Sequence, residues 1–165
     1  MTVERLTARK VMSRVLVAVA PEESVLMAWE IMRRADVHHL PVVRGARLLG
    51  VLTREDVTAA WYGGPEAQSS QQVQELVVRR RTPRVHADEP LERVCSTMLD
   101  AGHDSVPVLA EDGALVGLIT ARDVLAAVAG RTPPEGEGGQ LVTGMFRLEP
   151  VLPAMTKEGS TDALT

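Results

Sequence analysis

Two threonine–aspartate pairs with the same spacing are the residues of this sequence best suited to chemistry. Thr53 and Asp56 lie in the stretch GVLTREDV, and Thr120 and Asp123 lie in the stretch GLITARDV. Each pair follows an apolar run and precedes residues with helical apolar spacing. We therefore expect each pair where a strand ends and a helix begins.

The Thr-x-x-Asp pattern has two interpretations that use the same geometry. In the first, it is a capping box that satisfies free N–H groups of the first helical turn and contributes on the order of 1 kcal/mol. In the second interpretation, the Thr–Asp pair binds the ribose and phosphate of a ligand. A helix N-terminus suits a phosphate, and one carboxylate can accept hydrogen bonds from both vicinal hydroxyls of a ribose. A threonine hydroxyl there could donate to the phosphate, and the aliphatic strand residues nearby could flank a flat base.

The two pairs occupy matching positions of an internal repeat, with copies at residues 11–62 and 76–130. HLPVV in the first copy matches SVPVL in the second, and SVLMAWEIM matches PLERVCSTM. Each copy has the pattern of a strand, a helix, two strands and a final helix. One copy alone would bury little apolar surface. The sequence therefore predicts an α/β fold in which two β-α-β-β-α units pack together.

Apolar spacing also predicts the first strands, at Val15 to Val19 and at Arg84 to His86, and the buried helix faces. The residues expected on those faces are Val25, Ala28, Trp29 and Met32; Leu91, Val94, Cys95 and Met98; Val57, Ala60 and Trp61; and Val124 and Val128. The two tryptophans are expected to pack in the core or in a dimer interface.

Three segments are expected to lie outside the two units. Residues 1–10 form an N-terminal segment, 63–75 a linker, and 131–165 a second linker with a C-terminal tail. The composition of GGPEAQSSQQ predicts a flexible link, and RTPPEGEGGQ is expected to be equally unstructured. The following LVTGMFRLEPVL is apolar enough to pack, and the last residues are expected to be frayed.

Composition excludes several classes of function. The net charge of −4 and the four aromatic residues disfavour nucleic-acid binding, and RRRTPR at 79–84 is interpreted as a solvated segment before a strand. A single cysteine, Cys95, cannot form an intrachain disulfide and is expected in the core. No metal-ligand spacing or catalytic set is present, so we expect no metal site and no enzyme. The longest apolar run is too short to span a bilayer and the N-terminus is a poor signal peptide, so a cytoplasmic location is expected.

The duplicated pattern resembles a tandem pair of CBS domains, the cystathionine-β-synthase repeats that form a Bateman module. The resemblance covers residues 11–130 and rests on two copies of G-h-h-T-x-x-D, each behind its own Pro-Val strand. It implies a pseudo-twofold module whose clefts bind AMP, ADP, ATP or S-adenosylmethionine, with no required cofactor. It also implies a homodimer shaped as a flat disc and the regulation of another protein.

In the family, each cleft combines the Thr–Asp pair of one repeat with the Pro-Val strand of the other. The resemblance therefore implies a first cleft formed by Val17, His38, His39, Pro41, Thr120, Arg122 and Asp123. It implies a second cleft formed by Thr53, Glu55, Asp56, Pro83, Asp104, Ser105 and Pro107.

The charges near the expected phosphate position rank the two clefts. The first cleft has Arg122 and two histidines, whereas the second has Glu55 and Asp104 at the matching positions. We therefore expect the first cleft to bind the nucleotide. The second is expected to stay empty or to bind a less anionic ligand, such as an adenosine compound with a positively charged sulfonium group. Arg79 to Arg81 would reverse this order if they reached into the second cleft.

Two functional hypotheses follow from the sequence. The favoured one is a stand-alone sensor whose adenosine ligand shifts the population of its conformations. The alternative is a protein-interaction or dimerisation module in which the Thr–Asp pairs only cap helices, with weak nucleic-acid binding through 79–84 as a minor variant.

Overall fold

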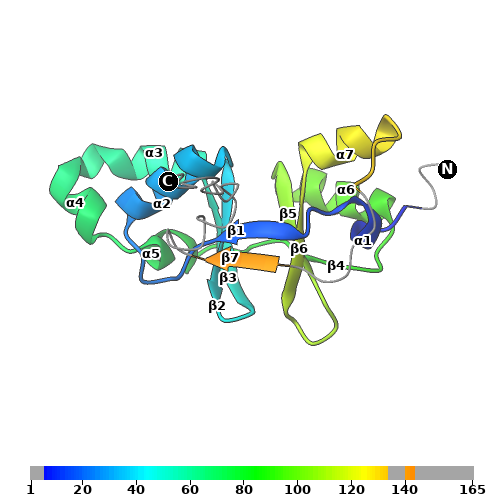
Figure 1. Cartoon of the computed structure of the whole chain (residues 1–165), viewed down its shortest axis with the longest axis horizontal. Helices are drawn as coiled ribbons and strands as arrows, with labels where there is room; N and C mark the ends of the chain where they lie inside the picture. Colours follow the sequence, from blue (N-terminus) through cyan, green and yellow to red (C-terminus); the bar gives the residue numbers. More distant parts are fainter. Residues whose placement is uncertain (1–5, 134–139, 144–165) are drawn as a thin grey trace, which may run out of the picture.

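The computed structural model describes residues 6–133 and 140–143 of the chain. Two α/β halves lie side by side, and each has helices on one side and a β-hairpin on the other (Figure 1). The first half contains α2 (Val25–Ala35), β2 (His39–Arg44), β3 (Arg47–Thr53) and α3 (Arg54–Ala60). The second half contains β4 (Val85–His86), α6 (Leu91–Ala101), β5 (Ser105–Leu109), β6 (Leu115–Thr120) and α7 (Ala121–Val128).

The predicted order of elements is found in both halves. β2 pairs with β3, and β5 pairs with β6, as antiparallel hairpins, while β4 adds to β5 in parallel. The first strand of the chain, β1 (Val15–Ala18), instead pairs in parallel with β7 (Gln140–Thr143). The apolar run LVT thus contributes to a strand. The predicted frayed end, and most of the predicted linker and tail, lie outside the described residues.

Helix burial follows the predicted apolar spacing in most positions. α2 buries Val25, Ala28, Ile31 and Met32, and α6 buries Leu91, Val94 and Met98. The prediction is wrong for Val128, which is 62% exposed because α7 buries Ala127 instead. Trp29 and Trp61 remain more than one-third exposed and pack on each other, with ring centroids 5.3 Å apart.

Two short helices are exchanged between the halves. α1 (Ala8–Val11) precedes the first repeat in sequence, yet Ala8, Val11 and Met12 belong to the apolar core of the second repeat. α5 (Val73–Val77) precedes the second repeat, yet both its terminal valines are buried in the core of the first. Figure 1 shows α1 beside α6 and α5 in the opposite half. The exchange ties the repeats together, and sequence boundaries drawn at residues 10 and 76 did not anticipate it.

The prediction that residues 63–72, within the linker at 63–75, form a flexible link is wrong. A 3-10 turn, η2 (Trp61–Gly63), leads into α4 (Gly64–Ser70), which has a proline in its first turn, where a missing N–H is harmless. Gln68 of α4 is 6% exposed, and its Nε2 donates a hydrogen bond to the Trp61 carbonyl over 3.0 Å. Glycine and proline here start a helix that packs near α2, so the chain between the repeats is ordered.

The glycine of each repeated stretch makes room for an exchanged segment. A Cβ added at Gly50 would lie 2.8 Å from the Cβ of Val77, at the end of α5. A Cβ added at Gly117 would overlap the side chain of Met12, directly after α1. The close approach that these glycines allow therefore positions the two chain segments that lead toward the clefts.

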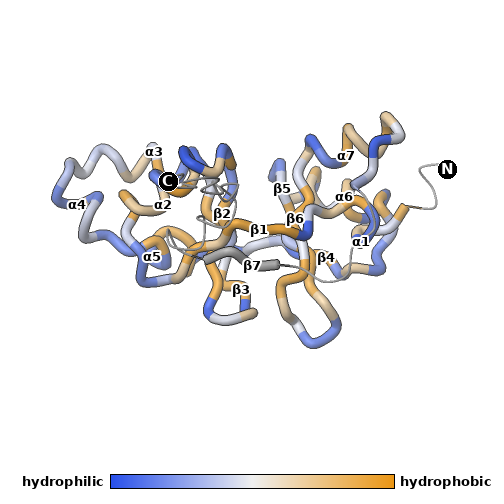
Figure 2. The backbone as a smooth tube through the Cα atoms, viewed as in Figure 1, coloured by the Kyte–Doolittle hydropathy of each residue, from blue (hydrophilic) through white to orange (hydrophobic). Residues whose placement is uncertain are grey.

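A third apolar cluster joins the two halves between the hairpins. It consists of Leu16, Ala18, Val43, Leu48, Leu109, Leu115 and Leu118. Figure 2 shows the apolar residues concentrated along the strands that meet at the centre of the molecule. Within the described residues, no helix has the length and apolar character needed to cross a membrane.

Candidate functional site

Both Thr–Asp pairs form capping boxes, as the first interpretation of the pattern predicted. In α3, the Thr53 Oγ1 accepts from the Asp56 N–H at 3.2 Å, and the Asp56 Oδ2 accepts from the Thr53 N–H at 2.8 Å. In α7, the matching distances for Thr120 and Asp123 are 3.3 Å and 2.8 Å. The local sequence thus fixes both side chains at the ends of β3 and β6.

The two carboxylates differ in what remains free. Asp123 uses Oδ2 for both local bonds, accepting from the Thr120 N–H at 2.8 Å and from the Thr120 hydroxyl at 3.0 Å. Among the described residues, none donates a hydrogen bond to its Oδ1. The Thr120 hydroxyl was expected to face a phosphate, but here its hydrogen is directed at Asp123.

Asp56 has no such free oxygen. The Arg80 guanidinium donates to Asp56 Oδ2 over 2.7 Å and to Asp56 Oδ1 over 2.6 Å, in a two-pronged ion pair. Burial by itself would raise the pKa of Asp56, but the hydrogen bonds from Arg80 and Thr53 outweigh it, so the pKa lies below its ordinary value. Asp56 is therefore held as a carboxylate by groups of its own chain.

A cavity of about 610 Å³ lies between the halves at the start of α7. All the residues predicted for the first cleft line it, namely Val17, His38, His39, Pro41, Thr120, Arg122 and Asp123. Sequence reasoning missed further lining residues, namely Ser13, Val15, Leu16, Asp36, Val37, Leu118 and Ala121. Its volume falls within the range of roughly 300–1,000 Å³ that is typical of small-molecule sites.

The position of Asp104 differs from its predicted place in the second cleft. Asp104 lines the first cleft, because its backbone carbonyl accepts from the Ala121 N–H at 2.8 Å at the start of α7. Its Oδ1 lies 2.9 Å from His39 Nε2 of the other repeat. The first cleft thus combines Arg122 and two histidines with three aspartates, Asp36, Asp104 and Asp123.

The second cleft is almost filled. Its cavity measures about 20 Å³ and is lined by four of the predicted residues, Thr53, Pro83, Ser105 and Pro107. Arg80 and Arg81 also line it, together with His103, whereas Asp56, Asp104 and Glu55 do not. The predicted charge contrast between the clefts is therefore wrong: the basic side chains gather in the second cleft. Space, and not charge, distinguishes the first.

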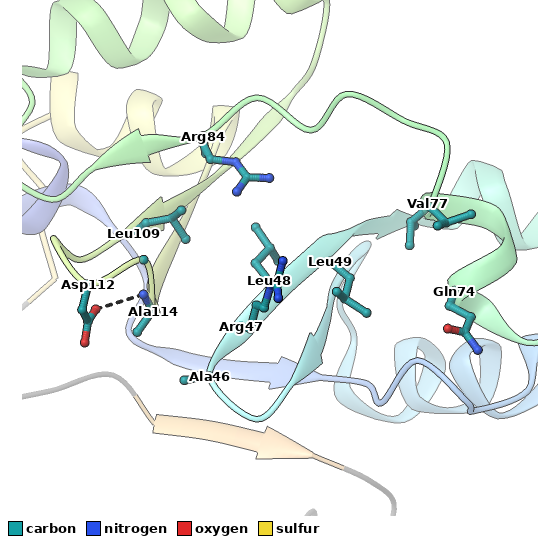
Figure 3. Close-up of a pocket in the computed structure, with 12 residues that line it drawn as sticks. Ala46, Arg47, Leu48, Leu49, Gln74, Val77, Arg84, Leu109, Asp112 and Ala114 are labelled. Carbon is teal, nitrogen blue, oxygen red and sulfur yellow. Dashed lines mark hydrogen bonds between the residues drawn. The ribbon is translucent and has the colours of Figure 1, made fainter.

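A cavity of about 720 Å³ lies on the hairpin side of the molecule, between the β2–β3 and β5–β6 turns. Figure 3 shows Arg47 and Arg84 directed toward its middle over Leu48, while Asp112 bonds to the Ala114 N–H of its own turn. None of the predicted site residues lines it. Although this cavity is larger, it lacks a carboxylate at a helix start, so the Thr–Asp chemistry belongs to the first cleft.

The remaining candidate residues offer little chemistry. Cys95 packs at the edge of the second repeat's core, and burial raises the pKa of its thiol, which suits a packing role. In the part of the chain that the structure describes, no group of three or more His, Cys, Asp or Glu side chains could hold a metal ion.

Comparison with known proteins agrees with the fold and the duplicated motif. The family model described as "CBS domain" matches residues 8–63 and again residues 73–130. The chain thus belongs to the CBS domain family and contains a tandem pair. It is 30% identical over 131 residues to the inosine-5'-monophosphate dehydrogenase of Korarchaeum cryptofilum, covering 79% of this chain and 26% of that enzyme. It is 28% identical to the L-aspartate semialdehyde sulfurtransferase of Methanocaldococcus jannaschii, covering 66% of this chain and 20% of that enzyme. The matched region thus spans only 26% and 20% of the lengths of these two enzymes.

Solved structures show the same arrangement of repeats. The structure of CBSX2 in complex with AMP is 25% identical, with a TM-score of 0.65, and the match covers 75% of this chain and 96% of CBSX2. The cytosolic domain of the Mg²⁺ channel MgtE in complex with ATP is 30% identical, with a TM-score of 0.60, covering 70% of this chain and 46% of that domain.

Proposed function

We propose that this CBS pair is a non-catalytic, cytoplasmic regulatory module that binds one adenosine-containing ligand in its first cleft. The ligand class comprises AMP, ADP, ATP and S-adenosylmethionine. The similar structures of CBSX2 with AMP and of the MgtE cytosolic domain with ATP support this class. A second protein, regulated by this module, would respond to the ligand-bound state.

The free oxygen of Asp123 carries this proposal. Its Oδ2 is used for the helix cap, but its Oδ1 has no donor among the described residues and Asp123 lines a cavity of about 610 Å³. A ribose hydroxyl is the kind of neutral donor that such an oxygen accepts. Val15, Val17 and Leu118 provide an apolar wall for the flat base, and Arg122 stands one residue away for a phosphate.

Isothermal titration with the four ligands tests the proposal. We expect micromolar binding near one equivalent per chain, lost in Asp123→Asn. The matched control is Asp56→Asn, which changes the same motif at a residue that does not line the first cleft and should leave the binding intact. Absence of binding by folded protein, or loss of binding in Asp56→Asn alone, would contradict the proposal. The former outcome would favour the interaction module.

We also propose that the chain forms a homodimer through its helices. Apolar side chains stay exposed on the helices of both repeats, namely Leu26, Trp29, Trp61, Tyr62, Leu99, Leu125 and Val128. Leu99 is 81% exposed and Tyr62 is 94% exposed, which suits a surface that a second copy covers. Sedimentation velocity should give a dimer, and Leu99→Glu with Leu125→Glu should give a monomer. A wild-type monomer at high concentration would contradict the proposal.

A further inference from the structure

In the second cleft, Arg80 bonds to Asp56. In the first cleft, the proposed function gives the equivalent position, beside Asp123, to the ribose of the ligand. We propose that Arg80 is a built-in occupant that keeps the second cleft closed, so that each chain has one open nucleotide cleft. Removal of its side chain then converts the second cleft into a ribonucleotide site. This inference rests on the proposed function, because it takes the role of Asp123 as the template for Asp56.

The contact between Arg80 and Asp56 engages both oxygens of the carboxylate. Arg80 Nη1 and Nη2 bond to separate oxygens of Asp56 over 2.7 Å and 2.6 Å, and Oδ2 also accepts from the Thr53 N–H. The Asp56 side chain is 16% exposed and that of Arg80 is 36% exposed. A two-pronged pair with this burial is less screened by solvent than an ordinary surface ion pair.

A ribose competes poorly with this guanidinium. The ribose hydroxyls are neutral donors, whereas the guanidinium carries a positive charge and binds both carboxylate oxygens in a two-pronged arrangement. Displacing Arg80 would also leave the partly buried charge of Asp56 with weaker partners. The internal contact therefore excludes the ligand as well as filling its space.

The fold holds Arg80 at the position that this contact needs. The Arg80 N–H donates to the Val77 carbonyl over 3.1 Å, so Arg80 follows α5 in a tight turn. Val77 is buried in the first repeat, where Gly50 leaves room for it. The end of α5 is thereby fixed on β3, directly before the helix that carries Asp56.

The corresponding segment of the first cleft carries no such occupant. Residues 13–17 lead from α1 into β1 and contribute Ser13, Val15, Leu16 and Val17 to the cavity wall. The segment's one arginine, Arg14, is turned away and donates to the Arg9 carbonyl over 3.1 Å. The contrast between a cavity of about 610 Å³ and one of about 20 Å³ follows from this difference.

Isothermal titration of the full chain with AMP tests the inference in the Asp123→Asn background, where the first cleft is disabled. Asp123→Asn alone should show no binding of AMP. The double variant Asp123→Asn/Arg80→Ala should bind AMP near one equivalent per chain, at least tenfold more tightly than Asp123→Asn alone. The regained binding should disappear when Asp56→Asn is added. Arg81→Ala is the matched control, because Arg81 lines the same cavity and forms no ion pair with Asp56.

Each outcome has a distinct meaning. Regained binding that depends on Asp56 and is absent from the Arg81→Ala control supports the inference. No regained binding by folded Arg80→Ala and Arg80→Ser variants, or equal binding with Arg80 present, overturns it. If the wild type binds no AMP while the Arg80→Ala variants do, the proposed first cleft fails, and only the closure of the second cleft by Arg80 is supported. Circular dichroism establishes that each variant is folded.

Discussion

His39 Nε2 lies 2.9 Å from Asp104 Oδ1, so a hydrogen bond crosses from the first repeat to the second at the edge of the first cleft. The His39 side chain is only 11% exposed, whereas that of Asp104 is 72% exposed. The pair holds the ring from its solvent side and places an acidic group beside the expected phosphate position. The same bond therefore joins the two repeats and holds a negatively charged side chain at the first cleft.

Removing the charge of Asp104 should favour ligands with more phosphates. In Asp104→Asn, the amide oxygen still accepts from His39, but the repulsion of phosphate is gone. We expect ATP to bind about three- to fivefold more tightly at low salt, with a smaller gain for AMP and almost none for adenosine. The gain should shrink at high salt, because this side chain is exposed. Asp100→Asn, an exposed change on α6 outside the cavity, is the control. An equal gain for adenosine would refute the electrostatic explanation.

The lowered pKa of Asp56 predicts how stability depends on pH. Folding lowers the pKa of Asp56, so its ionised carboxylate stabilises the fold at pH values above its ordinary pKa of 3.8. This stabilisation is lost as the pH falls through the lower pKa of the folded state. We expect Asp56→Asn to reduce the free energy of unfolding by up to about 1 kcal/mol at neutral pH, because the amide can still accept from the Thr53 N–H but forms no charged pair with Arg80. The difference from wild type should narrow as the pH falls below 3.8. Urea unfolding at several pH values measures it.

The control for this pH dependence is Glu55→Gln, on the same turn of α3. Its side chain is exposed and forms no hydrogen bond within the described part of the chain. Its stability should therefore follow that of the wild type across the same pH range. A gap between Asp56→Asn and wild type that widened in acid would show that Arg80 does not stabilise the ionised carboxylate.

The duplicated motif made the fold and the residues of the first cleft predictable. The sequence G-h-h-T-x-x-D encodes a strand end, a cap and a carboxylate within one short stretch, so local patterns sufficed to place Thr120 and Asp123. His38, His39 and Pro41 were assigned to this cleft by the resemblance to the CBS family, in which the Pro-Val strand of one repeat faces the Thr–Asp pair of the other. Thr120 and Asp123 depend on their own neighbours in sequence, which is the kind of information a single sequence contains, whereas the pairing of the two repeats in one cleft came from the family.

The closure of the second cleft could not be predicted, because it depends on a contact between residues far apart in sequence. Arg80 follows Asp56 by 24 residues, and the chain between them was expected to be flexible. Only the packing of α5 on the first repeat brings the guanidinium to the carboxylate. The basic run at 79–84 is evident in the sequence. Where its side chains point depends on α4 and α5, and the glycine, proline and serine residues before α5 predicted a flexible chain and not helices.

A methyl group at Gly50 should disturb α5 as well as lower stability. In Gly50→Ala, the new Cβ would lie 2.8 Å from the Cβ of Val77, which cannot rotate away. We expect a loss of about 1–3 kcal/mol in the free energy of unfolding. Hydrogen exchange should rise in α5. Gly113→Ala is the control: it has open space and a φ of +85°, so only backbone strain acts and α5 should stay protected. If the amides of α5 exchanged as slowly in Gly50→Ala as in the wild type, the close approach of Gly50 and Val77 would be refuted.

The ordered chain between the repeats gives a last prediction. Gln68 is buried on α4 and donates to the Trp61 carbonyl, so Gln68→Ala should remove this bond and leave that carbonyl with the Gly64 N–H as its donor. We expect a loss of about 1 kcal/mol in the free energy of unfolding. Faster hydrogen exchange over residues 64–77 should accompany it. Ser69→Ala, an exposed change on the next residue, should have an effect below about 0.5 kcal/mol. If wild-type residues 64–77 already exchanged as fast as an unfolded peptide, the segment would be the flexible linker that its composition suggested, and Arg80 would lose the support that holds it on Asp56.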